Sequence, residues 1–234
     1  MKVLAVDCAT EYCSAALWLD GALIERSAPP ARGQSEQLLH WVAELLAEGG
    51  VSLRALDLIA FGRGPGAFTG VRMATSIAQG LAFSLGLPVA PVSTLRAVAV
   101  HALALAPQAD EVLVCQDARI HEVYWARFAR CAEGACLQGE EHLGSPTSVD
   151  LALRPAQVVA GSGFNAYAEL AAAWQGRSAA GANGFVAPLH APSRAQDIAR
   201  LAAGDGLAAA VTPDHALPVY LRDDVAKPSV PEAL

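Results

Sequence analysis

Two aspartates stand at equivalent places in the two halves of the chain, each at the end of a largely apolar run that predicts a buried strand. Asp7 ends the run that begins at Val3, and Asp117 follows the run that begins at Glu111. In a two-lobed ATPase, carboxylates at such positions face the cleft and hold a metal–phosphate group. An aspartate after a strand also caps the next turn through backbone N–H groups, and we favour this interpretation for Asp117. Both interpretations stay open for Asp7, which with Thr10 would form a vestigial phosphate site.

A glycine-rich segment follows the strand predicted over residues 56–61 and precedes a helix, which is the context of a backbone anion site. The segment contains no lysine, however, and Pro65 removes one N–H donor. We therefore favour a structural elbow that sets the direction of the helix over a nucleotide site. The expected elbow consists of Gly62, Arg63, Gly64, Pro65, Gly66, Thr69 and Arg72.

The remaining candidate groups do not assemble into a recognised catalytic pattern. Of the six histidines, no two lie three or four positions apart, so no helix offers a pair of imidazoles to a metal. No serine lies in a Gly-x-Ser-x-Gly motif, which leaves an α/β-hydrolase without support. We therefore expect no catalytic residue, no metal and no intrinsic cofactor. An odd number of cysteines at irregular positions predicts reduced structural thiols at Cys8, Cys13, Cys115, Cys131 and Cys136.

The helix expected over residues 69–85 is apolar nearly all round, with Arg72 as its single charged residue. Small residues recur on it every four positions and so form one stripe. A helix of this kind is normally buried on more than one side, by its own sheet and by a second domain or a partner chain. The helix expected over residues 34–48 also carries apolar residues off its main apolar face. We predict a partner interface made of Leu39, Ala43, Gly70, Met73, Ala74, Ile77, Ala78, Leu81 and Ala82.

The composition indicates a folded protein that does not hold nucleic acid by itself. Hydrophobic residues make up 53% of the 234 residues and charged residues 17%, which argues against disorder. The net charge of −7 is unsuited to binding a phosphate backbone without a basic partner. No uncharged apolar run is long enough for a membrane span, and Asp7 and Glu11 stand where a signal peptide needs an apolar stretch. A cytoplasmic location is therefore expected.

The order of predicted elements repeats along the chain. Strand, aspartate, second strand, turn and third strand follow one another in the first half, and the same order returns 110 residues later. This duplication predicts two β-β-β-α-β-α lobes with a cleft between them, the plan of the actin-like ATPase (RNase H-like) fold, an α/β fold. We expect an N-terminal lobe over 1–106 that carries the partner-binding helices, a C-terminal lobe over 107–222 and a loose tail over 223–234. The last helix, about 193–203, is expected to pack back on the N-terminal lobe.

Distinctive segments are spread over nearly the whole chain. They read Val3-Leu-Ala-Val-Asp7-x-Ala-Thr10, Ala60-Phe-Gly-Arg-Gly-Pro-Gly-Ala-Phe-Thr-Gly-Val-Arg72, Gln79-Gly-Leu-Ala82, Val92-Ser-Thr-Leu95, Asp117-Ala-Arg119, Glu122-Val-Tyr-Trp125 and Pro218-Val-Tyr-Leu-Arg222. Together these segments resemble the TsaB (YeaZ) family. The resemblance implies an actin-like, two-lobed fold and the role of a non-catalytic scaffold or dimerisation subunit in the N6-threonylcarbamoyladenosine modification of tRNA.

The resemblance also implies a set of partners. Members of the family are paralogues of TsaD, the catalytic subunit that transfers threonylcarbamoyl from threonylcarbamoyl-AMP to adenosine 37 of tRNAs that read ANN codons. By resemblance, the chain binds and activates a TsaD-type paralogue through the helices over 34–48 and 69–85, and a TsaE-type ATPase joins them. tRNA is then reached only through the complex, ATP with Mg²⁺ belongs at most to the assembled complex, and the chain alone forms a homodimer through the same surface. The TsaD-type pattern includes a His-x-x-x-His metal pair, which this sequence lacks, so the chain is not expected to be an enzyme by itself.

A second class of function is an enzyme, an actin-like-fold ATPase or small-molecule kinase that acts on its own. This alternative rests on Asp7 and on the two-lobed plan. Micromolar binding of ATP to the isolated chain, abolished by Asp7→Ala, would favour it. A peptidase has the support of neither a histidine metal pair nor a nucleophile elbow.

Overall fold

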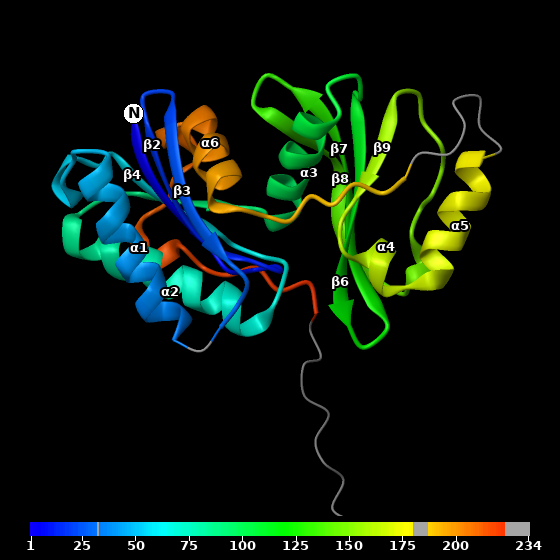
Figure 1. Ribbon diagram of the computed structural model, residues 1–234, viewed down its shortest axis with the longest axis horizontal. Helices are drawn as coiled ribbons and strands as arrows, with labels where there is room; N and C mark the ends of the chain where they lie inside the picture. The colour runs from blue at the N-terminus through cyan, green and yellow to red at the C-terminus, as the bar shows by residue number, and fades with distance from the viewer. Residues whose placement is uncertain (32, 180–186, 223–234) are drawn as a thin grey trace, which may run out of the picture.

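The computed structural model describes residues 1–31, 33–179 and 187–222, which form two α/β lobes that lie side by side (Figure 1). Each lobe contains one sheet, and helices lie on both of its faces. Within the described residues, no helix is both long and apolar enough to cross a membrane. The tail expected over 223–234 lies outside the described residues.

The sheet of the N-terminal lobe has the strand order β3-β2-β1-β4-β5. Its first three strands form an antiparallel meander, and β4 and β5 join it in parallel on the side of β1. The turn between β2 and β3 holds Asp20 and Gly21 at positive φ, a conformation that an Asp-Gly pair adopts readily. The strands span Lys2–Asp7 (β1), Cys13–Leu19 (β2), Ala22–Ala28 (β3), Leu58–Gly62 (β4) and Val89–Val92 (β5).

The sheet of the C-terminal lobe repeats this plan in the order β8-β7-β6-β9. Again three antiparallel strands are followed by a strand that pairs in parallel with the first of them, as expected for a duplicated RNase H-like, actin-like fold. The two halves differ after the third strand, where the first half has a long helix, α1, and the second has a 3-10 turn at Pro146–Ser148. The strands span Glu111–Arg119 (β6), Glu122–Cys131 (β7), Gly134–Gly144 (β8) and Gln157–Ala160 (β9).

The last helix of each half packs on the sheet of the other half. Helix α3 precedes the expected boundary after residue 106, yet it contacts all four strands of the C-terminal sheet, while α6 contacts β1, β2 and β4 of the N-terminal sheet. These two helices share one large core between the lobes. On the outer faces, α1 and α2 cover the N-terminal sheet, and α4 and α5 cover the C-terminal one (Figure 1). The helices span Gln34–Glu48 (α1), Phe68–Leu85 (α2), Thr94–Leu105 (α3), Gly163–Ala166 (α4), Ala168–Ala179 (α5) and Ala195–Asp205 (α6).

The cysteines depart from expectation, because four of them form two disulfides. Cys8 is bonded to Cys13, and Cys131 is bonded to Cys136, whereas Cys115 is a buried free thiol. Each pair is separated by four residues that turn the chain from one antiparallel strand to the next. The turns bring the Cα atoms within 4.1 Å and 5.9 Å of each other. The prediction of five reduced thiols is therefore wrong for these four residues, since a count of cysteines takes no account of hairpin geometry.

Candidate partner-binding surface and interlobe cleft

Helix α1 presents one face to the sheet and the opposite face to solvent. Its apolar residues recur at the helical period, so that one stripe of them can face the core. On the opposite side Leu39 is 49% exposed and Ala43 is exposed as well. Next to them His40 and Glu44 form a surface ion pair at 3.0 Å. The buried stripe consists of Leu38, Trp41, Val42, Leu45 and Leu46.

Helix α2 buries its stripe of small residues within the chain itself. Ala74, Ala78 and Ala82 are fully buried in the core under the sheet. A Cβ atom at Gly70 would lie 1.8 Å from the carbonyl oxygen of Cys8, so the helix and the end of β1 approach too closely for any side chain. The prediction that these four residues belong to a partner interface is therefore wrong, because the chain's own sheet already covers them.

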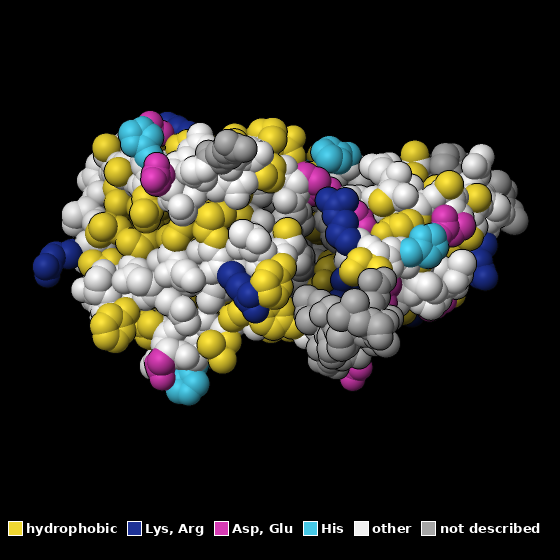
Figure 2. All heavy atoms as spheres, turned by 90° about the horizontal axis from the view of Figure 1, so that it is seen from below, with side chains coloured by type: hydrophobic (Ala, Val, Ile, Leu, Met, Phe, Trp, Pro, Cys, Tyr) yellow, Lys and Arg dark blue, Asp and Glu magenta, His cyan; other side chains and the backbone are white. Residues whose placement is uncertain are grey.

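A different side of α2 is only partly covered by the core. Met73, Ile77 and Leu81 are half-buried there, whereas Phe83, on another flank of the helix, is 82% exposed. Figure 2 shows this underside of the N-terminal lobe, where hydrophobic and uncharged atoms fill the middle and most charged side chains lie towards the margins. The α1/α2 face, as we name this surface, consists of Leu39, Ala43, Met73, Ile77 and Leu81.

The single charged side chain of α2 is engaged at the rim of the cleft between the lobes. Nε of Arg72 donates a hydrogen bond to the hydroxyl of Tyr220 at 2.7 Å, and its guanidinium carbon lies 3.4 Å from the ring centre of Phe68. Both aromatic residues line the cleft. These contacts direct the guanidinium of Arg72 towards the cleft and away from Met73, Ile77 and Leu81.

The glycine-rich elbow is packed against atoms of the chain itself. A Cβ atom at Gly62 would lie 2.1 Å from Oδ1 of Asp7, and one at Gly66 would lie 2.4 Å from the carbonyl oxygen of Ala9. Gly64 has a φ of 94°, a conformation that disfavours residues with a side chain. The close approach of the chain to itself thus accounts for these glycines without a bound phosphate. Of the other residues predicted for the elbow, Pro65 is buried and Thr69 is exposed in the first turn of α2.

The elbow also joins the two lobes. Nη2 of Arg63 donates to Oε2 of Glu141 in β8 at 3.2 Å, and the hydroxyl of Ser93 donates to the other oxygen of the same carboxylate. The carbonyl oxygen of Gly64 accepts a hydrogen bond from the N–H of Thr94 at 3.0 Å. Sequence reasoning missed Glu141, because nothing near it in the chain predicts which residue of the other lobe it meets.

Asp7 lies at the end of β1 with its side chain fully buried. Its Oδ1 accepts a hydrogen bond from the N–H of Ala9 at 3.1 Å, which is the local turn contact that the sequence left open. Burial raises the pKa of Asp7 to about 6, because a charged carboxylate is poorly solvated there. Asp7 does not line the cleft, whereas Thr10 does and donates its hydroxyl to the carbonyl oxygen of Ser193 at 3.3 Å. The structure therefore does not bring Asp7 and Thr10 together as a phosphate site.

The cleft between the lobes has a volume of about 750 Å³ and is lined by residues of both. Two acids, Glu11 and Asp117, line it. Oδ1 of Asp117 accepts hydrogen bonds from the N–H of Arg119 at 2.8 Å and from the hydroxyl of Tyr167 at 2.7 Å. The guanidinium of Arg119 lies 3.0 Å from Oδ2. Asp117 thus caps the turn that follows it, and an adjacent cation balances its charge.

The cleft does not suit the Mg²⁺–ATP that an actin-like ATPase holds. The carboxylate of Asp7 is turned into the core, and that of Asp117 is occupied by Arg119 and Tyr167. The backbone of the elbow at Gly66 is already approached by Ala9. These groups therefore do not fit a metal–phosphate ligand.

Known proteins resemble the chain over nearly its full length. Residues 29–229 match the family model described as "TsaD: tRNA N6-adenosine threonylcarbamoyltransferase". The tRNA threonylcarbamoyladenosine biosynthesis protein TsaB of Escherichia coli is 37% identical over 242 residues, which cover 99% of each chain. The protein of the same name from Haemophilus influenzae is 44% identical over 130 residues, 56% of this chain and 55% of its own. The solved structure of YeaZ from Pseudomonas aeruginosa superposes with a TM-score of 0.81 at 37% identity, covering 94% of this chain and 99% of that one.

Proposed function

The chain belongs to the TsaB (YeaZ) family, and we propose that it is the non-catalytic scaffold subunit of a complex that makes N6-threonylcarbamoyladenosine in tRNA. In this role it binds a TsaD-type catalytic paralogue and activates it. The names of its relatives place them in the biosynthesis of this modified nucleoside. The match to the TsaD family model supports a shared fold with the paralogue, which is the basis for pairing one lobe against another.

The observation that carries the proposal is the α1/α2 face. Leu39 lies exposed on α1, and Met73, Ile77 and Leu81 of α2 keep part of their apolar surface in solvent, which gives a patch of the kind that a partner covers. Partly exposed aliphatic side chains of this kind can fill pockets of a partner. The absence of a charged residue other than Arg72 in α2 supports a dry, close-packed contact, because a buried unpaired charge would oppose it.

Two further observations support a non-catalytic role for this chain. The sequence contains no histidine pair with the spacing of the metal site that the resemblance attributes to the paralogue. The elbow and the two strand-end aspartates serve packing and turn capping, as the contacts of Gly62, Asp7 and Asp117 indicate. The alternative of an independent ATPase loses its main support, since it rested on Asp7 as a ligand in the cleft.

The proposal extends to the other components of the complex. A TsaE-type ATPase joins the pair, and any ATP with Mg²⁺ is bound by the assembled complex rather than by this chain. tRNA is held by the partners, in keeping with the net charge of −7. Without the paralogue, a second copy of the chain covers the same α1/α2 face and gives a homodimer.

Co-purification with the TsaD-type paralogue tests the binding surface. Leu39→Arg places a charge on the α1/α2 face, whereas Leu153→Arg places one at a leucine of similar exposure, 45%, in the C-terminal lobe. We expect Leu39→Arg to weaken the complex by at least about thirtyfold, the effect of losing one binding hot spot of about 2 kcal/mol. Leu153→Arg serves as the matched control and should bind like the wild type. Equal binding by Leu39→Arg, with its fold intact by circular dichroism, would contradict the surface assignment.

Reconstitution tests the division of labour. The chain alone, given tRNA and threonylcarbamoyl-AMP, is expected to form no modified nucleoside, while its addition to the paralogue increases the rate. Asp7→Ala should keep this stimulation, because Asp7 is buried away from the cleft and the α1/α2 face. Product formation by the isolated chain would show that it is an enzyme after all.

A further inference from the structure

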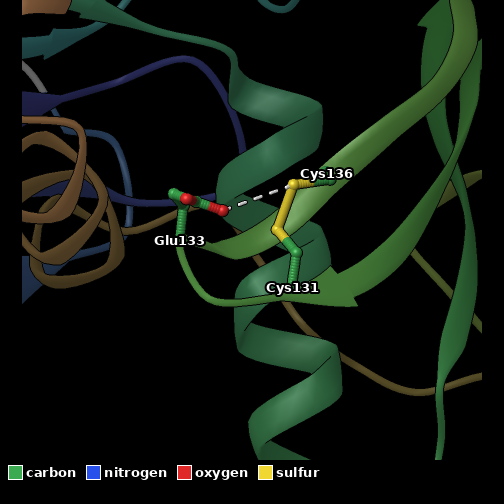
Figure 3. Close-up of side chains that lie close together, drawn as sticks. All are labelled: Cys131, Glu133 and Cys136. Carbon is green, nitrogen blue, oxygen red and sulfur yellow. Dashed lines mark hydrogen bonds between the residues drawn. A yellow bond between two sulfur atoms is a disulfide. The ribbon is translucent and has the colours of Figure 1, made fainter.

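The hairpin between β7 and β8 places two sulfur atoms and a carboxylate at one point of the molecule (Figure 3). Cys131 ends β7, Cys136 lies in β8, and Glu133 stands in the turn between them. Their Sγ and carboxylate oxygen atoms all lie within 4.8 Å of one another. In the part of the chain that the structure describes, this is the one group of three or more His, Cys, Asp or Glu side chains that meets this distance.

A side chain of helix α3 holds the backbone of this turn by hydrogen bonds. The guanidinium of Arg96 donates to the carbonyl oxygens of Ala135 at 2.8 Å and Glu133 at 3.4 Å. Arg96 is itself paired with Asp205 of α6 at 2.5 Å, so its position is set independently of the hairpin. The turn is therefore held in place whether or not its two sulfur atoms are bonded to each other.

The side chain of Glu133 is left available by these contacts. It is exposed, and its Oε2 lies 3.7 Å from Sγ of Cys136. Among the described residues, no basic side chain forms an ion pair with it. An acid without a cation, aimed at a pair of sulfur atoms, is a suitable third ligand for a metal ion.

We propose that the reduced form of this hairpin binds one Zn²⁺ through Cys131, Glu133 and Cys136, and that the disulfide is the metal-free, oxidised form of the same site. Four residues separate the cysteines, within the usual spacing of paired zinc ligands. Two Zn–S bonds of about 2.3 Å each can join sulfur atoms whose Cα atoms are 5.9 Å apart without a change of backbone. Water completes a tetrahedral set. The site does not depend on the proposed function.

Reduction of the disulfide and uptake of Zn²⁺ convert the oxidised form of the site into the metal-bound form. A dithiol reductant gives two electrons and two protons to the disulfide, which becomes two thiols, and the reductant becomes a disulfide in turn. Zn²⁺ then displaces the two thiol protons, which pass to the solvent. Binding therefore weakens as the pH falls, because protons compete for the same sulfur atoms.

Calorimetric titration with Zn²⁺ alone tests the proposal on the full chain. The chain is first reduced with a phosphine, which does not compete for zinc as a thiol would. We expect one Zn²⁺ per reduced chain and no binding to the oxidised chain. Cys131→Ser and Glu133→Gln each alter a direct ligand, so both should weaken binding by more than the roughly tenfold to hundredfold that loss of an outer-shell partner costs. The double variant Cys8→Ser/Cys13→Ser removes the other disulfide and should bind like the wild type.

Several outcomes would overturn the proposal. These are failure of the reduced wild type to bind, unchanged binding by Cys131→Ser or by Glu133→Gln, and loss of binding in the Cys8→Ser/Cys13→Ser variant. Co²⁺ provides a readout that needs no substitution, because thiolate ligands give it a sulfur-to-metal charge-transfer band. That band should appear only after reduction, and its absence from the reduced wild type loaded with Co²⁺ would also overturn the assignment.

Discussion

The outer faces of the two lobes differ in what they offer to another molecule. In the N-terminal lobe, α1 and α2 cover the sheet and still leave Leu39 and Phe83 exposed. In the C-terminal lobe, α5 turns its large apolar residues, Leu170 and Trp174, inward against the sheet. Among the residues of α5 whose side chains the structure describes, the exposed ones are small or polar, namely Ala168, Ala172, Ala173, Gln175, Gly176 and Arg177.

This difference is accompanied by a departure from the repeat on the outer face. The first four strands of the N-terminal sheet have counterparts in the order of the C-terminal sheet, but α1 has only a 3-10 turn, Pro146–Ser148, as its counterpart in the second half. The additional helix lies with α2 on one side of the N-terminal sheet and widens the apolar surface there (Figure 2). The duplicated sheets thus supply the fold, whereas the proposed binding role combines α2, which belongs to the repeat, with α1, which lies outside it.

The largest expected effect comes from a charge placed on the buried side of α2. Ala78→Glu buries a carboxylate without a partner in the core under the sheet, and should lower the free energy of unfolding by about 3–5 kcal/mol. Ala172→Glu makes the same change on the exposed side of α5 and should alter it by less than about 0.5 kcal/mol. Urea denaturation of both variants measures the difference. Similar midpoints would show that the small-residue stripe of α2 is not core.

The next prediction concerns Asp7, the buried aspartate of the N-terminal lobe. Burial raises the pKa of Asp7 from its ordinary value of 3.8 to about 6. Between these two values the carboxyl group is ionised in the unfolded chain but largely protonated in the folded one. This group alone should therefore cost the wild type about 2 kcal/mol of stability as the pH rises from 4 to 7. Asp7→Asn removes this loss, so its stability relative to the wild type should be greater at pH 7 than at pH 4 by that amount. Parallel pH profiles of the two proteins, measured by denaturant unfolding, would contradict the burial of a titrating Asp7.

Two smaller effects on stability distinguish the buried side of α2 from its exposed side. Gly70→Ala drives a Cβ atom into the carbonyl oxygen of Cys8 and should cost about 1–3 kcal/mol. Gly80→Ala meets no atom within 4 Å and should stabilise the helix by about 0.5–1 kcal/mol. The same chemical change thus has opposite signs at two positions of one helix. Thermal denaturation decides between them, and equal shifts of Tm in one direction would refute the assigned orientation of α2.

Much of the fold was predictable from local patterns. The Asp20-Gly21 turn, the apolar alternation of the strands and the return of the same order after 110 residues predict the two related sheets. The helix over 34–48 was predicted within its observed bounds, because Gly49 and Gly50 end its apolar period. The expected helix over about 193–203 is observed as Ala195–Asp205, and it contacts the N-terminal sheet.

The features that sequence reasoning missed depend on contacts between distant segments. An apolar stripe predicts burial but does not say what buries it, so Ala74 and Ala78 were assigned to a partner rather than to the sheet. The crossing of α3 to the other lobe and the Arg63–Glu141 contact have no local signal either. The disulfides depend on the hairpin geometry, and the spacing of Cys131 and Cys136 does not by itself show that Glu133 lies beside both sulfur atoms.

Amide hydrogen exchange of the chain with and without the TsaD-type paralogue tests the central claim most directly, because it compares both outer faces in one experiment. We predict that the paralogue slows exchange in Gln34–Glu48 and Phe68–Leu85, and leaves Ala168–Ala179 unchanged. Leu39→Arg should remove the protection of both helices, whereas Leu153→Arg should retain it. Protection that falls on α5, or a complex that forms without protecting α1 and α2, would contradict the account.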